Sequence, residues 1–148
     1  MQTAAGIPKQ DPQLIKGKLA NGLTYFIRPN AEPKGRFSIR LRVNTGSLNE
    51  TDDIQGVSHF LEHMAFQGTK NFPGKGIITS LEKHGVSFGR NINAYTAQNE
   101  TVYNLSDVPT NSESLLDTCL LILHDWSYYL TLEDDEIDAE RGVITVSY

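Results

Sequence analysis

The 148-residue sequence contains a single cysteine, Cys119, which excludes an intramolecular disulfide and a zinc site built from cysteines. Its 13 lysines and arginines are outnumbered by 18 aspartates and glutamates, and this net charge of −5 argues against nucleic acid as a partner. No apolar run approaches the roughly 20 residues of a membrane span, so no membrane span is predicted. The first residues also lack the basic start and apolar run of a signal peptide, which leaves the compartment open.

What remains is the composition of a globular domain, with 39% hydrophobic and 21% charged residues. Residues 1–13 contain two prolines and little periodicity, so they are predicted to form a mobile lead-in, with the folded domain over 14–148.

Periodicity and turn signals predict the order of the secondary-structure elements. The expected elements are a hairpin over 14–19 and 23–28, a strand over 36–43, helices near 55–68 and 76–83, strands over 87–97 and 101–106, and helices over 112–129 and from Thr131 onward. This order favours an α+β fold with helices on one face of a mainly antiparallel sheet. The long helix carries apolar residues on more than one face, so we expect it to be well buried, with His124 as a core histidine.

The stretch that carries chemistry is 57–66, which contains His59, Glu62 and His63. Residues of a helix advance about 100° each, so the two histidines lie one turn apart with Glu62 on the same side. Apolar residues at positions 57, 60, 61 and 64 form a separate face for a core. Two neutral imidazoles beside a carboxylate suit Zn²⁺ and a general base: the metal activates a water molecule, and Glu62 accepts its proton and passes it to the leaving amine of a peptide.

The alternative interpretation of this stretch is a surface helix with two solvated histidines. The separate apolar face argues against it, as does Phe66, which falls among the polar positions. A face that mixes histidine, glutamate and phenylalanine is more typical of a cleft than of bulk solvent.

The order His-x-x-Glu-His resembles that of the inverzincins, the pitrilysin/insulinase family of zinc metallopeptidases. Further matching stretches lie at 21–25, 56–66, 68–70, 93–96, 100–103 and 140–144. The resemblance covers about residues 17–144, corresponds to the N-terminal domain, and is greatest to bacterial periplasmic members. It implies a C-terminally incomplete domain with the fold of mitochondrial-processing-peptidase-like metallohydrolases, so that 14–148 would be a partial N-terminal zinc peptidase domain. It further implies a periplasmic location, a peptide or unfolded polypeptide substrate, and a need for the remaining peptidase domains or a partner chain.

The family also implies roles for individual residues. His59 and His63 would bind zinc, and Glu62 would be the catalytic base. A bound peptide would add to the sheet as an extra strand, with Asn93 and Ala94 contacting its backbone and Thr96 supporting them; the alternative is that Asn93 and Thr96 serve only a turn and a strand.

The third zinc ligand is a downstream glutamate in this family, and two positions compete for it. Spacing alone points to Glu140, which lies 140 − 63 = 77 residues beyond His63. The local motif instead makes Glu140 a supporting residue and puts the ligand at position 147, which is Ser147 here. A hydroxyl is a weak neutral ligand, so this interpretation predicts that the third ligand is missing and that Glu140 would at most shift to reach the metal.

Three hypotheses follow from the sequence. The chain is a zinc-dependent endopeptidase domain; or it is a non-catalytic homologue or fragment that acts as a peptide- or partner-binding module; or it is a structural interaction domain in which the motif is vestigial.

Overall fold

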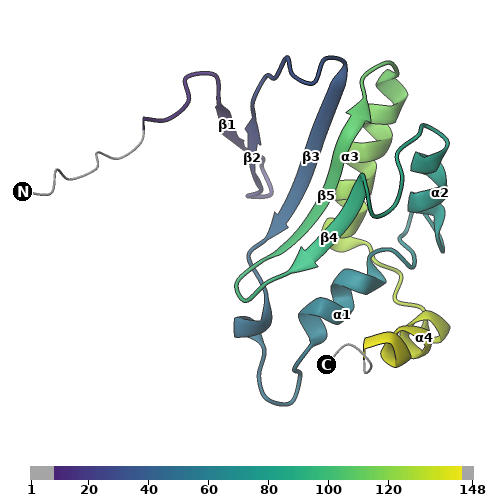
Figure 1. Cartoon of the computed structure of the whole chain (residues 1–148). Helices are drawn as coiled ribbons and strands as arrows, with labels where there is room; N and C mark the ends of the chain where they lie inside the picture. The colour runs from purple at the N-terminus through teal and green to yellow at the C-terminus, as the bar shows by residue number, and fades with distance from the viewer. Residues whose placement is uncertain (1–8, 145–148) are drawn as a thin grey trace, which may run out of the picture. The chain divides into compact units, whose positions relative to one another are not determined.

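The computed structural model describes residues 9–144 (Figure 1). The chain divides into two units, residues 1–34 and 35–148. In the first, β1 (Ile15–Lys18) pairs antiparallel with β2 (Thr24–Ile27). Gly22 has a positive φ of 92° in the connecting turn, as the Asn-Gly pair predicts, so the predicted hairpin is confirmed.

The second unit is built on a three-stranded antiparallel sheet. Its strands are β3 (Arg36–Val43), β5 (Thr101–Pro109) and β4 (Ile92–Thr96), in the order β3-β5-β4. The alternation predicted in β3 is observed for most of its length: Phe37, Ile39 and Leu41 pack against the core, and the arginines lie on the other face. Val43, at the end of the strand, is 37% exposed. Figure 1 shows α3 (Glu113–Tyr128) behind this sheet, which agrees with the predicted α+β arrangement.

Helix α3 buries one stripe of side chains rather than most of its surface. The stripe, which packs on the sheet, consists of Leu115, Cys119, Ile122 and Trp126. The prediction of a well-buried helix was wrong, because leucines on its other side, at positions 116, 120 and 121, are exposed. The assignment of His124 to the core was also wrong: its side chain is 56% exposed and stacks on Tyr129. No helix in the described part of the chain is long and apolar enough to cross a membrane.

Helix α1 (Val57–Met64) is shorter than predicted, and a distant carboxylate caps its N-terminus. The two Glu50 oxygens accept hydrogen bonds from the backbone N–H groups of Gly56 (2.7 Å) and Ser58 (2.8 Å). These bonds lower the pKa of Glu50, with the bond from Ser58 contributing most. The cap replaces the usual serine or aspartate beside the helix and satisfies N–H groups that the helix itself cannot.

Between Asn44 and α1, the short 3-10 helix η1 (Ser47–Asn49) lies against the turn that joins β4 to β5. The backbone N–H groups of Ser47 and Leu48 donate to the carbonyl oxygens of residues 97 and 98, at 3.2 and 2.8 Å. Gly46 makes this approach possible, because a Cβ at that position would overlap the carbonyl oxygen of Ala97.

A buried carboxylate joins α3 to the loop after α1. Asp125 is 0% exposed and accepts three hydrogen bonds of 2.8 Å, from Thr69 Oγ1, Asn71 N and Asn71 Nδ2. Burial acts to raise the pKa of Asp125, but these hydrogen bonds outweigh it and the pKa is lowered. We call Asp125, Thr69 and Asn71 the Asp125 latch.

The remaining helices are α2 (Gly76–Glu82) and α4 (Asp134–Ile144). Helix α4 begins later than predicted, so Thr131 lies two residues too early to be its N-cap; the Thr131 N–H instead donates to the Gly68 carbonyl at 3.1 Å. Strand β4 is shorter than the predicted strand over 87–97. The side chain of Asn91 accepts from Ser87 N and donates to Ser106 O, both at 3.0 Å, and so folds residues 87–91 into a loop.

Candidate metal centre and neighbouring sheet edge

Helix α1 brings His59 and His63 together as their spacing predicts. Their rings meet edge to face, and their Nε2 atoms are 3.0 Å apart. Two nitrogens bound to one tetrahedral zinc at 2.0–2.1 Å lie about 3.3 Å from each other. The two Nε2 atoms therefore fit adjacent ligand positions of one metal ion with only a small adjustment.

Glu140 contacts His63 on the side away from His59. Its Oε1 is 2.6 Å from His63 Nδ1, and its Oε2 accepts a 3.0 Å hydrogen bond from Gln67 Nε2. A carboxylate accepts hydrogen bonds, so this contact places a proton on Nδ1 and leaves a lone pair on Nε2, the atom that faces His59. Helices α1 and α4 pack together, and Glu140 is only 7% exposed between them.

Glu62 lies beside the two histidines and is also buried, at 8% exposure. Its Oε2 is 3.9 Å from His59 Nε2 and accepts a 3.0 Å hydrogen bond from Thr96 Oγ1 at the end of β4. Burial, and secondarily the charge of Glu62, raise the pKa of Tyr103 to about 12. The site thus holds a hydrogen-bonded carboxylate directly next to the nitrogen pair.

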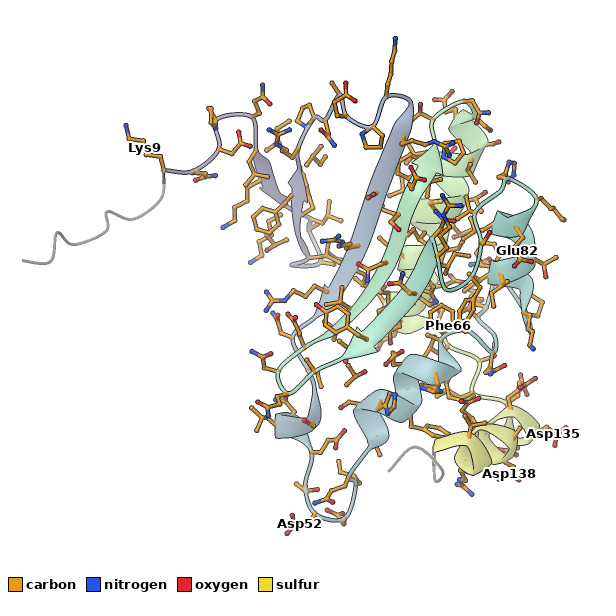
Figure 2. All side chains as sticks on the ribbon, viewed as in Figure 1. Lys9, Asp52, Phe66, Glu82, Asp135 and Asp138 are labelled. Atoms are coloured by element: carbon orange, nitrogen blue, oxygen red, sulfur yellow. The ribbon has the colours of Figure 1, made fainter. Side chains whose placement is uncertain are left out.

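The helix faces differ from those expected. Of the residues predicted to face a core, Met64 is buried at 1% exposure, but Val57 and Leu61 are 40% and 38% exposed. The side of α1 that carries Glu62 packs on β4. Phe66 does not line a cleft: it is buried in the core, where it packs edge to face on Trp126, and its ring also meets that of the exposed Phe88. Figure 2 shows Phe66 beside the end of α1. Residues 65–66 lie beyond the end of the helix, where a helical projection no longer predicts which way a side chain points.

The described residues contain no group of three histidine, cysteine, aspartate or glutamate side chains arranged to hold a metal ion. Glu140 does not complete such a group, because its carboxylate is directed to Nδ1 of His63. Position 147, which the local motif assigns to the third ligand, lies outside the described residues. The roles of His59, Glu62, His63 and Glu140 therefore stay predictions.

The sequence interpretation missed Gln67, which holds the second oxygen of Glu140. The spacing of four residues from His63 is no signal for it, because Gln67 lies beyond the end of α1, where helical periodicity no longer applies. The cap from Glu50 had no signal either, because the loop between Glu50 and α1 has no fixed geometry in sequence.

Strand β4 forms one edge of the sheet and ends at this site. Backbone bonds at both of its ends, from Ser106 N to Asn91 O and from Ala97 N to Glu100 O, place odd-numbered residues in the ladder with β5. The backbone polar groups of the even-numbered residues therefore point outward. Those of Ile92 bond to the 87–91 loop, which leaves Ala94 and Thr96 as the open edge within the described residues.

Asn93, in contrast, has its backbone in the β4–β5 ladder, and its side chain lies on the sheet face opposite Glu62. There its Oδ1 accepts a 3.0 Å hydrogen bond from Asn104 Nδ2. The predicted contact of Ala94 with a peptide backbone is compatible with the outward groups of that residue. For Asn93, the side chain rather than the backbone is available to contact a peptide.

Residues 25–148 match the family described as Insulinase (Peptidase family M16). The chain belongs to this family. It is 49% identical over 142 residues to "Probable zinc protease PqqL" of Escherichia coli, covering 96% of this chain and 15% of that protein. The PqqL of Haemophilus influenzae is 44% identical over 134 residues, covering 90% and 14%.

Among solved structures, the first half of the periplasmic protease PqqL from Escherichia coli superimposes with a TM-score of 0.89 at 48% identity. The match covers 97% of this chain and 30% of that one. The predicted family, its N-terminal domain and the α+β fold are confirmed, and at the level of the family the associated metal is zinc. The chain spans about a seventh of the length of these curated relatives.

Proposed function

We propose that this chain is the part of a zinc-dependent metalloendopeptidase that carries its metal-binding helix, with residues 14–148 as part of the N-terminal domain. The observation that carries the proposal is the pair of Nε2 atoms 3.0 Å apart, one of them freed of its proton by the contact between Glu140 and Nδ1 of His63. Zinc, when bound by His59 and His63, supplies an acidified water molecule and polarises the carbonyl of the scissile bond.

The protein residues have distinct tasks in this proposal. Glu62 accepts the proton of the attacking water and donates it to the leaving amine, and the bond from Thr96 keeps its carboxylate beside the nitrogen pair. Glu140 fixes the tautomer and the ring orientation of His63, and Gln67 holds Glu140 in turn.

The substrate is proposed to be a peptide or an unfolded polypeptide that pairs with the outward backbone groups of Ala94 and Thr96. Strand addition places such a peptide next to Glu62, because Thr96 belongs to both the edge and the site. The remaining peptidase domains or a partner chain would complete the enzyme, since this chain covers 15% of its Escherichia coli relative. By analogy with the protease described as periplasmic, we propose the same compartment.

A second function, a non-catalytic peptide- or partner-binding module, is favoured by one specific observation. The described residues provide two nitrogen ligands but no third group, and residue 147 is a serine rather than a carboxylate. In this case the sheet edge would bind peptides without cleaving them.

Zinc titration combined with a cleavage assay on an unstructured, quenched fluorescent peptide separates the two functions. With the remaining peptidase domains or the partner chain added, the peptidase proposal predicts zinc-dependent cleavage. Glu62→Gln should abolish this cleavage while zinc binding persists, and Glu133→Gln, a change at an exposed residue, should leave both intact. If zinc binds but no peptide is cleaved, and Glu62→Gln changes neither result, the binding module would be favoured.

Ser147→Glu tests, in the same assays, whether position 147 lacks the third zinc ligand. If it does, the added carboxylate becomes the third ligand and should tighten zinc binding by about 100-fold or more. Unchanged affinity would instead indicate that Glu140 moves to the metal as the third ligand.

A further inference from the structure

The face of the sheet opposite α3 carries three arginines from one strand. Arg36, Arg40 and Arg42 of β3 all lie on this face, which Figure 1 shows toward the viewer. Two of them have acidic partners: Arg36 pairs with Asp107 at 3.8 Å, and Arg42 with Glu100 at 2.5 Å. Within residues 9–144, no carboxylate lies within ion-pairing distance of Arg40. This face therefore has one excess positive charge in a protein whose net charge is −5.

Arg40 borders a groove of about 260 Å³ on this face. Its lining residues come from all three strands: Arg40, Asn93, Tyr95, Val102, Asn104 and Ser106. Strand register explains the grouping, since Arg40 and Asn93 both lie opposite Asn104 and so form a row across the sheet. The groove thus has a cation at one end and an amide at the other, close to the open edge of β4.

The hydrogen bonds within the groove determine which groups are left for a ligand. The Tyr95 hydroxyl donates a hydrogen bond to Glu100, which also accepts one from Arg42. These three side chains therefore bond to one another rather than to a ligand. Asn104 donates to Asn93 Oδ1, which leaves the two N–H donors of Asn93 Nδ2. Arg40 adds a planar set of guanidinium donors. A row that ends in guanidinium and amide donors is suited to a carboxylate, the acceptor that arginine binds most strongly in peptides.

We propose that this groove binds a carboxylate of a peptide that lies along the edge of β4. The inference rests on the proposed function in that the ligand is the peptide substrate. Alternate side chains of an added strand point to opposite faces of the sheet, so every second side chain points to the face of Arg40 rather than to that of Glu62. The first of these side chains pass next to Asn93, and a long acidic side chain directed across β4 enters the groove over β5, which Arg40 lines from the far side, on β3. The predicted substrate class is therefore a polypeptide with a glutamate among the side chains that point to the face of Arg40.

The carboxylate has two possible sources, an acidic side chain or the C-terminus of the peptide, and the test separates them. Fluorescence anisotropy would measure the binding of labelled peptides to the zinc-free protein, which does not cleave them, at about 0.15 M salt. One pair of end-blocked peptides differs only in glutamate or glutamine at every second position. A second pair carries glutamine throughout and differs only in a free or an amidated C-terminus.

The expected result is about tenfold tighter binding of the glutamate peptide than of its glutamine counterpart. Arg40→Gln should reduce this preference to less than about twofold, and Asn93→Ala should reduce it in part. Arg36→Gln is the matched control, because it removes the same charge from the same strand face at a residue that already has a partner; it should retain the preference. A preference for the free C-terminus, lost in Arg40→Gln, would support the groove with the terminal carboxylate as its ligand.

The proposal is overturned if the wild-type chain does not discriminate within either pair, if none of the peptides binds, or if Arg36→Gln and Arg40→Gln lose the preference equally. Thermal unfolding monitored by circular dichroism checks that the variants are folded. Zinc titration of the same samples tests the peptidase proposal separately. A glutamate preference without zinc binding would contradict the proposed metal site but still support the proposed groove.

Discussion

Glu140→Gln removes the charge that orients His63 while keeping the size of the side chain. The glutamine oxygen can still accept from Nδ1, but the 2.6 Å contact becomes a neutral hydrogen bond, and the new amide group conflicts with the donor of Gln67. A charge-assisted bond contributes about 1.5–3 kcal/mol and a neutral one about 0.5–1.5. Loss of a residue that orients a metal ligand typically weakens metal binding 10–100-fold, or by about 1.4–2.7 kcal/mol, and we expect a loss of zinc affinity in this range.

Competition titration against a zinc chelator measures this change, and nitrogen NMR of the histidine ring reports the tautomer of His63. Glu133→Gln is the matched control, because it makes the same change at an exposed residue just before α4. It should leave both the affinity and the tautomer unchanged. Wild-type affinity in Glu140→Gln, with His63 still protonated on Nδ1, would refute the assigned role. A loss far above 100-fold would show that Glu140 is itself a zinc ligand.

Three further predictions concern the scaffold, and denaturant unfolding monitored by circular dichroism tests each of them. Asp125→Ala leaves the buried donors of the Asp125 latch without a partner and should cost about 3–5 kcal/mol; a cost below 1 kcal/mol would refute the latch. Glu50→Ala should cost about 1–2 kcal/mol at neutral pH. The pKa of Glu50 is lowered in the folded protein, so its contribution to stability is present above the unfolded pKa of about 4.3 and is lost as pH falls through the folded pKa. The free energies of unfolding of wild type and variant should therefore converge in acid. A constant difference between them would contradict this. Gly46→Ala should destabilise by about 1–3 kcal/mol through overlap with a carbonyl oxygen, whereas Gly142→Ala in α4, where a Cβ meets no atom within 4 Å, should stabilise by about 0.5–1 kcal/mol; equal effects would contradict the packing account.

Local patterns predicted most of the fold. The Asn-Gly turn, the alternation of β3 and the four-residue spacing of His59 and His63 each describe neighbours in sequence, and each is observed. The same locality explains why the buried face of α1 was predicted only in part, with Met64 buried but Val57 and Leu61 exposed. Periodicity identifies an apolar face but not which neighbour packs on a helix, and β4 packs on the side of α1 that carries Glu62.

Contacts between distant residues were beyond prediction from a single sequence. The cap from Glu50, the Asp125 latch and the bond from Gln67 to Glu140 link loops and helices through side chains of common types. Asn93 illustrates the same limit within one strand. Its motif indicated a role near the peptide, but only the pairing with Asn104 places its side chain on the face of Arg40.

The central claim, that His59 and His63 form the metal-binding half of a peptidase site, is tested most directly by zinc titration of the purified chain and of His59→Ala. Calorimetry should detect zinc binding by the wild type and a loss of affinity of several hundredfold or more in the variant, since one of two nitrogen ligands is removed. His84→Ala, which changes a histidine outside the site, should bind as the wild type does. Absence of zinc binding by the wild type, or equal binding by His59→Ala, would contradict the account.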